Sequence, residues 1–219
     1  MNRHAQALRG YPLWWRWTLA TAVGEFVGFA VPAAVGPIAV RALVGLAPVP
    51  RALATLTLLA LAGATEGAAL GYGQWLILRR TLPAIAARAW VLSTAVAAGI
   101  AYVLGLLPSA LSDLGASFAA ILPASVLAAF LLLVSIGFAQ WLTLRHHVPR
   151  AAWWILANAT AWVAGLTVPI AAVAFVPDGS PTFAYIAAGV VSGWIMGLVV
   201  AAITGVALVR LVRTVNTSD

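Results

Sequence analysis

The stretch GYGQWLILR at residues 71–79 recurs as GFAQWLTLR at residues 137–145, an offset of 66 residues without a gap. Pro83 and Pro149 follow the two copies at the same distance. Each copy ends a long apolar run with an arginine, and a second apolar run begins after a short loop. Internal repeats decide the fold before any single motif does. The repeated unit here is a pair of apolar helices.

The composition indicates that this chain is solvated by lipid. Its 219 residues are 63% hydrophobic and 8% charged, with a mean hydropathy of +1.03, whereas soluble domains carry about 25% charged residues. We therefore expect residues 1–219 to form a single transmembrane domain. There is no cysteine, which excludes disulfides and cysteine-based metal sites. The basic residues are scattered at predicted helix ends and form no basic stripe, so we expect no nucleic-acid partner.

Six apolar stretches are long enough to be membrane spans, because about 20 residues cross a hydrocarbon core of about 30 Å. They cover residues 13–31, 53–78, 89–107, 118–144, 152–175 and 185–209. The predicted fold is an all-α membrane protein with six transmembrane helices. The repeat groups them into three tandem helical hairpins, over about 13–80, 81–146 and 147–213. A two-helix repeat preserves orientation, so we expect a pseudo-threefold axis along the membrane normal.

The prolines bear on where the predicted spans end and bend. Pro32 and Pro37 follow the first span, and the segment up to Pro50 is open to a short re-entrant or interfacial helix. Pro123 is a candidate kink in the fourth span. The turn at 177–181 separates the last two spans. Because the first span is a full-length member of the repeat, we expect it to be retained and not cleaved as a signal peptide.

The loops predict the orientation. All twelve basic residues are arginine, and ten of them fall on one side: Arg3, Arg9, Arg16, Arg79, Arg80, Arg88, Arg145, Arg150, Arg210 and Arg213. Arg41 and Arg51 fall on the other side, with Asp113 and Asp178. Positive loops stay in the cytoplasm, so both termini are predicted to be cytoplasmic. Eight tryptophans gather near the cytoplasmic arginines, and we interpret them as an interfacial belt: Trp14, Trp15, Trp17, Trp75, Trp90, Trp141, Trp153 and Trp154.

Small residues recur at every fourth position of most spans. They follow Trp17, Trp90 and Trp154 at +3, +7 and +11, and two even-numbered spans carry glycine rows: Gly63, Gly67 and Gly71, then Gly189, Gly193 and Gly197. This small-xxx-small pattern is typical of close helix packing in membranes. Because nearly every span carries it, we expect packing within this bundle and not a dimer interface.

The GxxQWLxLR stretches at 71–79 and 137–145 resemble those of a group of uncharacterised bacterial multi-pass membrane proteins. The resemblance covers the ends of two hairpins, whereas the third ends at Arg210 and Arg213 without the Gln-Trp pair. It implies a multi-pass protein of the bacterial cytoplasmic (inner) membrane. It carries no activity or cofactor over to this chain.

Two acidic residues lie where charge is expensive. Glu25 is eight residues beyond Trp17 and Glu66 nine before Trp75, which places both roughly 12 to 14 Å from the cytoplasmic tryptophans, at the bilayer midplane. An ionised carboxylate there costs at least about 3 kcal/mol, and such groups face a cavity or a partner. If the two carboxyls meet, repulsion and lost hydration favour one shared proton. Two interpretations of these carboxyl groups stay open: a functional site and a structural hydrogen bond.

Three amides complete the set of candidate binding residues. Gln74 and Gln140 each lie five residues inside an arginine, roughly 7 Å below the interface. We expect hydrogen bonds across helices or to a neighbouring loop, with solute contact as the second interpretation. Asn158 follows Trp154 by four residues, as Thr21 follows Trp17 and Thr94 follows Trp90. For that tier we expect interhelical hydrogen bonds first and cavity lining second.

The remaining chemistry is sparse. The only histidines, His4, His146 and His147, lie at the cytoplasmic edge, so no imidazole is expected inside the bilayer. No catalytic or nucleotide-binding motif appears, and we expect neither an enzyme nor a bound cofactor or metal.

Three functional hypotheses remain. The first is a small permease or solute- and proton-binding protein that uses Glu25 and Glu66, since transporters bind ligands at the midplane. The second is a non-catalytic accessory or assembly subunit of a larger membrane complex. The third is the substrate-binding component of a multi-subunit importer, which the triplicate repeat disfavours. The expected partners are the lipid bilayer and either another membrane protein or a second copy of the chain.

Overall fold

The protein is described by a computed structural model that covers residues 10–177 and 179–215. That part of the chain forms six α-helices and no strand. They are α1 (Gly10–Ala42), α2 (Pro48–Thr81), α3 (Ala87–Asp113), α4 (Phe118–Leu144), α5 (Trp153–Ala174) and α6 (Thr182–Val215). All six are long and apolar enough to cross a membrane. The predicted all-α fold with six helices long and apolar enough to be membrane spans is confirmed.

The helices are longer than the apolar stretches that predicted them. α1 continues through Pro32 and Pro37 to Ala42, so the separate short helix considered before Pro50 is wrong. Proline removes its own N–H donor and crowds the carbonyl of the preceding turn, but a long membrane helix tolerates both effects where neighbouring groups compensate. Pro48 instead opens α2, in the first turn, where no N–H donor is needed.

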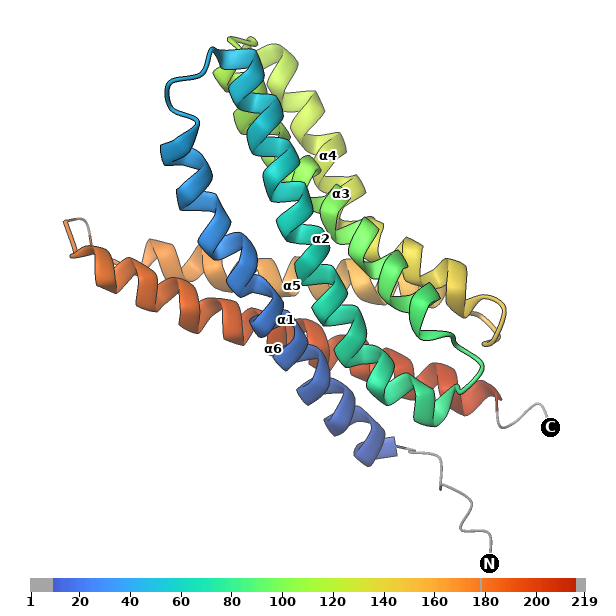
Figure 1. The fold of residues 1–219 in the computed structure, drawn as a ribbon. Coiled ribbons are helices and arrows are strands. Elements are labelled where there is room, and N and C mark those ends of the chain that lie inside the picture. Colours follow the sequence, from blue (N-terminus) through green and yellow to red (C-terminus); the bar gives the residue numbers. More distant parts are fainter. Residues whose placement is uncertain (1–9, 178, 216–219) are drawn as a thin grey trace, which may run out of the picture.

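The six helices form a closed ring. Each helix packs against its neighbours in the chain, and α6 also packs against α1. Four helix ends lie at the same end of the bundle, at the lower right of Figure 1: the start of α1, the end of α2, the start of α3 and the end of α6. We call this the arginine end, because Arg16, Arg79 and Arg210 lie on helix segments that reach it and Arg145 directly follows the end of α4. Its cytoplasmic location stays a prediction, and Arg3, His4, Arg9 and Asp178 lie outside the described residues.

Glycines let the first three helices approach closely. A Cβ on Gly28 of α1 would lie 2.8 Å from the Cα of Glu66 on α2. A Cβ on Gly67 of α2 would lie 2.5 Å from the Cβ of Ala98 on α3. On α6, by contrast, Gly189 and Gly193 have no atom within 4 Å of such a Cβ. The packing predicted for the α6 row is therefore wrong at these two positions, which border a cavity instead.

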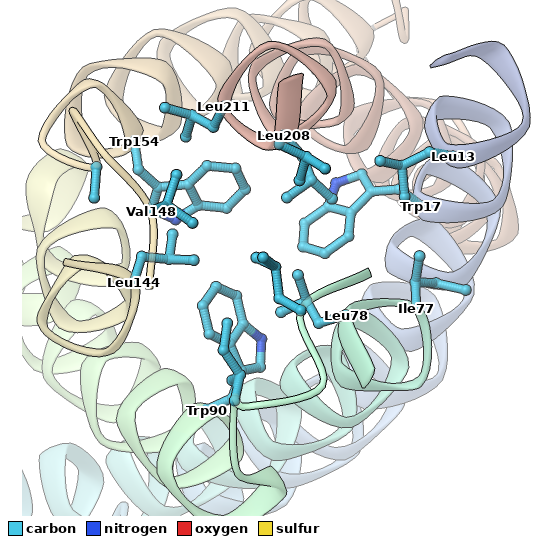
Figure 2. Close-up of a cluster of buried hydrophobic side chains, with 14 residues drawn as sticks. Leu13, Trp17, Ile77, Leu78, Trp90, Leu144, Val148, Trp154, Leu208 and Leu211 are labelled. Atoms are coloured by element: carbon cyan, nitrogen blue, oxygen red, sulfur yellow. The ribbon is translucent and has the colours of Figure 1, made fainter. Parts of the chain in front are cut away.

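The largest hydrophobic core lies at the arginine end, and we call it the tryptophan core. It consists of Leu13, Trp17, Ile77, Leu78, Leu82, Ile85, Trp90, Leu144, Val148, Ala151, Trp154, Leu208, Leu211 and Val212. Figure 2 shows its indole rings converging from three helices on a common centre. The ring centroids of Trp17 and Trp154 are 5.7 Å apart, and those of Trp90 and Trp154 are 6.3 Å apart. The core closes the ring of helices at this end.

The tryptophan core corrects the interpretation of the tryptophans as one interfacial belt. Trp17, Trp90 and Trp154 have no exposed surface, because each indole finds both apolar neighbours and an acceptor for its N–H inside the bundle. Trp15 and Trp153, in contrast, are exposed as a belt requires. The indoles of Trp75 and Trp141 are covered by the guanidinium groups of Arg79 and Arg145, 5.1 and 5.2 Å from the ring centroids.

Candidate binding cavity

A cavity of about 500 Å³ lies inside the ring, and all six helices contribute to its wall. Its lining is almost wholly apolar, and its few polar side chains include Glu25, Glu66, Tyr102 and Ser192. The volume is within the range of about 300 to 1,000 Å³ of small-molecule sites, which combine apolar walls with a few polar groups. This is the candidate functional site of the protein.

The two acidic residues meet at this cavity. Glu25 comes from α1 and Glu66 from α2, and their exposed fractions are only 5% and 7%. The carboxyl groups lie close enough to share a hydrogen bond when one of them carries a proton. The contact follows from the local sequence, because Gly28 lies directly against the backbone of Glu66 and brings the two helices together. Glu25 and Glu66 therefore form a carboxyl pair.

Tyr102 of α3 is a third member of the polar group. Its hydroxyl donates a hydrogen bond to Oε2 of Glu66, at 2.6 Å. Its ring lies over Gly63 of α2, where a Cβ would collide with it. The glycine thus makes room for the ring and fixes where the hydroxyl reaches. Sequence reasoning missed this residue, although a tyrosine deep inside a span and away from the aromatic belts was an available signal.

The other side of the carboxyl pair faces a much smaller polar space. Glu25 borders a second cavity of about 10 Å³, together with Thr21, Gln74, Asn158 and Thr204 among others. That volume is close to the lower limit of about 10 to 15 Å³ for one water molecule. Oε1 of Glu25 and Oγ1 of Thr21 are buried here without a hydrogen-bond partner among the described residues. A buried polar oxygen normally has a partner, so this space suits a single small polar guest.

Beneath it, toward the arginine end, lies a layer of hydrogen bonds between side chains. Nε1 of Trp90 donates to Oε1 of Gln74 at 3.1 Å, and Nε1 of Trp154 donates to Oε1 of Gln140 at 2.9 Å. Nε2 of Gln140 donates in turn to Oε1 of Gln74 at 2.8 Å and to Oγ1 of Thr94 at 3.0 Å. The interhelical bonding expected of the glutamines is therefore present.

The third indole has a different acceptor. Nε1 of Trp17 on α1 donates to Oγ1 of Thr204 on α6, at 3.1 Å. The third hairpin lacks the Gln-Trp pair of the other two, and a threonine is the acceptor in place of a glutamine. In all three cases the indole of an odd-numbered helix is held by the even-numbered helix before it in the ring.

The five predicted binding residues occupy different places. Glu25 and Glu66 line the large cavity, and Gln74 and Asn158 line the small one beside Glu25. Gln140 is completely buried in the hydrogen-bonded layer and borders neither cavity. Asn158 donates to the carbonyl of Trp154 in its own helix, so its role in the tier is cavity lining and not the interhelical bond that was expected first.

Trp162 is a second wall residue that the sequence did not assign to the site. It borders both cavities from α5. The signal was present, because Trp162 follows Trp154 by the same eight residues that separate Glu25 from Trp17. Ala98 is the corresponding position after Trp90 and lines the cavity too.

Access to the cavity is one-sided. The tryptophan core and the hydrogen-bonded layer close it toward the arginine end. On the other side its wall continues to Phe29, Leu106 and Gly189, and it is partly open. The cavity therefore extends from the carboxyl pair away from the arginine end.

No group of three or more metal-ligating side chains occurs in residues 10–177 and 179–215. In comparisons with known proteins, no family model, curated protein or solved structure matched the chain.

Proposed function

We propose that the protein is a small permease or solute-binding protein of the bacterial inner membrane, and that its cavity binds a cationic solute in exchange for a proton. The observation that carries this proposal is the carboxyl pair of Glu25 and Glu66, buried at the base of a cavity built from all six helices. Intramembrane ionisable residues that face a cavity mark substrate and proton pathways.

The exchange follows from the charge of the pair. Two carboxylates in contact inside an apolar cavity are not both ionised, because repulsion and lost hydration act together. One proton on the pair lets one carboxyl donate to the other. A cation that enters the cavity replaces the positive charge of the shared proton, and the proton then leaves the pair. The hydrogen bond from Tyr102 to Glu66 stabilises the ionised form.

The walls indicate the class of cation. Apolar side chains dominate the cavity, and Phe29, Tyr102 and Trp162 add aromatic surface. An aromatic face attracts a cation within about 6 Å of its centroid, more strongly when water is excluded. These features favour an organic cation with an apolar body over a small hydrated ion.

The proposal includes three related hairpins around a pseudo-threefold axis, with both termini in the cytoplasm. Two tiers support the symmetry. The indoles of Trp17, Trp90 and Trp154 meet in the tryptophan core. The residues eight positions later, Glu25, Ala98 and Trp162, all line the cavity. The arginine bias of the loops supports the orientation.

The two alternatives have less support. An accessory or assembly subunit would use an intramembrane glutamate against another chain, whereas Glu25 and Glu66 both line the cavity. A substrate-binding importer component is not expected to show the repeat at 71–79 and 137–145.

Calorimetry with tetraphenylphosphonium, a rigid apolar cation, tests the exchange. Titrations of the purified protein in buffers of different ionisation enthalpy report both affinity and protons released. We expect wild type to bind the cation and release about one proton, because the pair holds one. Glu25→Gln and Glu66→Gln are expected to abolish the release and weaken binding by at least about tenfold.

Two controls make this test specific. Asp113→Asn removes a carboxyl that lies outside the cavity lining and should bind like wild type. Tetraphenylborate, an anion of the same shape, should not bind. If the two glutamine variants release protons like wild type, or if the anion binds as well as the cation, the proposal is wrong.

A further inference from the structure

A third hollow lies on the outside of the bundle, between α5 and α6 at the arginine end. It measures about 550 Å³, and its lining includes Arg150, Trp153, Leu156, Thr160 and Arg210. It shares no residue with the central cavity. In a membrane its apolar wall faces lipid, and the two arginines border the same groove. We call it the outer groove.

The two arginines of the outer groove lack a protein counter-charge in the part of the chain that the structure describes. The acidic residues of that part are Glu25, Glu66 and Asp113. The first two belong to the central cavity, and Asp113 ends α3 at the opposite end of the bundle. Arg150 and Arg210 are both exposed, so an anion from outside the protein can reach both guanidinium groups.

The polarity of the groove matches the layers of a membrane. Trp153 is 64% exposed, and exposed indoles sit at the level of lipid headgroups. Arg150 lies three residues before it and lines the same groove. Along α5 and α6, away from the arginines, the wall is formed by side chains such as Leu156, Ile203 and Val206. A molecule that fills the groove needs an anionic head and an apolar body.

The backbone at Arg150 is unusual. Its φ of 56° is the only positive value at a non-glycine residue in the described chain. Such a conformation is uncommon for residues with a Cβ, and the surrounding structure has to hold it. The carbonyl of Arg150 accepts a hydrogen bond from N of Trp153 at 3.1 Å. The turn thus fixes the backbone positions from which Arg150 and Trp153 extend to the groove.

We infer that the outer groove is a binding site for an anionic phospholipid. The phosphate lies between the guanidinium groups of Arg150 and Arg210, and an acyl chain lies along the apolar wall. Guanidinium groups bind phosphate through paired, charge-assisted hydrogen bonds, and basic pockets between transmembrane helices bind anionic headgroups. This site is independent of the proposed solute exchange.

Native mass spectrometry of the detergent-purified protein tests the inference. The protein is equilibrated with phosphatidylglycerol or with phosphatidylcholine of the same acyl chains. We expect wild type to retain phosphatidylglycerol at least about tenfold more than phosphatidylcholine, because each arginine contributes about 1 kcal/mol to binding of an anionic lipid. The double variant Arg150→Gln/Arg210→Gln should lose that preference.

The matched control is Arg79→Gln/Arg145→Gln, which removes the same charge from two guanidinium groups stacked on tryptophans outside the groove. It should keep the preference. Ala157→Phe fills the groove without changing charge and should reduce retention of the lipid. Glycerol phosphate, the headgroup without chains, should not compete. Equal losses in the two double variants, or full competition by glycerol phosphate, would overturn the inference.

Discussion

The glycine rows of α2 and α6 offer a test of the packing, because the sequence pattern treats them alike and the structure does not. Gly67 and Gly193 are each the central glycine of a GxxxGxxxG row, and both border the central cavity. A Cβ at Gly67 would lie 2.5 Å from the Cβ of Ala98 and 2.7 Å from the carbonyl oxygen of Thr94. A Cβ at Gly193 would meet nothing within 4 Å.

The expected energies follow from these distances. Carbon atoms pack at about 3.5 to 4.0 Å, so Gly67→Ala must push α2 and α3 apart by about 1 Å, and overpacking of this kind costs about 1 to 3 kcal/mol. Both substitutions also gain about 1 kcal/mol from replacing glycine inside a helix. That gain cancels between the two variants. Gly67→Ala should therefore be less stable than Gly193→Ala by about 1 to 3 kcal/mol.

Unfolding in mixed micelles with increasing sodium dodecyl sulfate, followed by circular dichroism, measures the difference. We expect Gly193→Ala to unfold above the wild-type midpoint and Gly67→Ala at or below it. Equal free energies of unfolding, within about 0.5 kcal/mol, would refute the packing of α2 on α3 and the open wall of α6.

Three further predictions concern the hydrogen-bonded layer, the carboxyl pair and the topology. Gln140→Leu removes three side-chain hydrogen bonds. At about 0.6 kcal/mol for each bond, it should lower the free energy of unfolding by about 2 kcal/mol. Thr160→Val is the control, because the Thr160 hydroxyl bonds only within its own helix, and it should change the free energy of unfolding by less than about 0.5 kcal/mol. Tyr102→Phe removes the donor to the carboxyl pair and should weaken tetraphenylphosphonium binding about tenfold, because a hydrogen bond to a charged group contributes about 1.5 to 3 kcal/mol; unchanged affinity would contradict this. Cysteines introduced at Ala84 and Ala116, in a chain without native cysteine, should react with a membrane-impermeant maleimide from the cytoplasmic and external sides respectively, and labelling of both from one side would refute the predicted topology.

Much of the fold could be predicted because lipid imposes few solutions. An apolar run of sufficient length has to become a helix, and the six spans followed directly. The helix ends could not be predicted so well. Pro37 predicts the end of a helix, yet α1 continues past it to Ala42. The effect of a proline depends on neighbouring groups, and the local sequence does not specify them.

The level of the site along the helices was predictable, but the directions of its side chains were not. Counting residues from Trp17 and Trp75 placed Glu25 and Glu66 at one level, and the structure brings them together. Counting could not show which way a side chain points around its helix. Trp17 was therefore assigned to the membrane interface although it is fully buried, and Tyr102 was missed because its contact with Glu66 depends on how α3 lies over Gly63.

The exchange of a proton for a cation at the carboxyl pair is tested most directly by infrared difference spectroscopy on reconstituted protein, with and without tetraphenylphosphonium. We predict that binding removes a protonated-carboxyl band in wild type and in Asp113→Asn, and that Glu25→Gln and Glu66→Gln lack this change. If the carboxyl band is unchanged when the cation binds, the pair is a structural hydrogen bond, and an accessory subunit becomes the better interpretation of the protein.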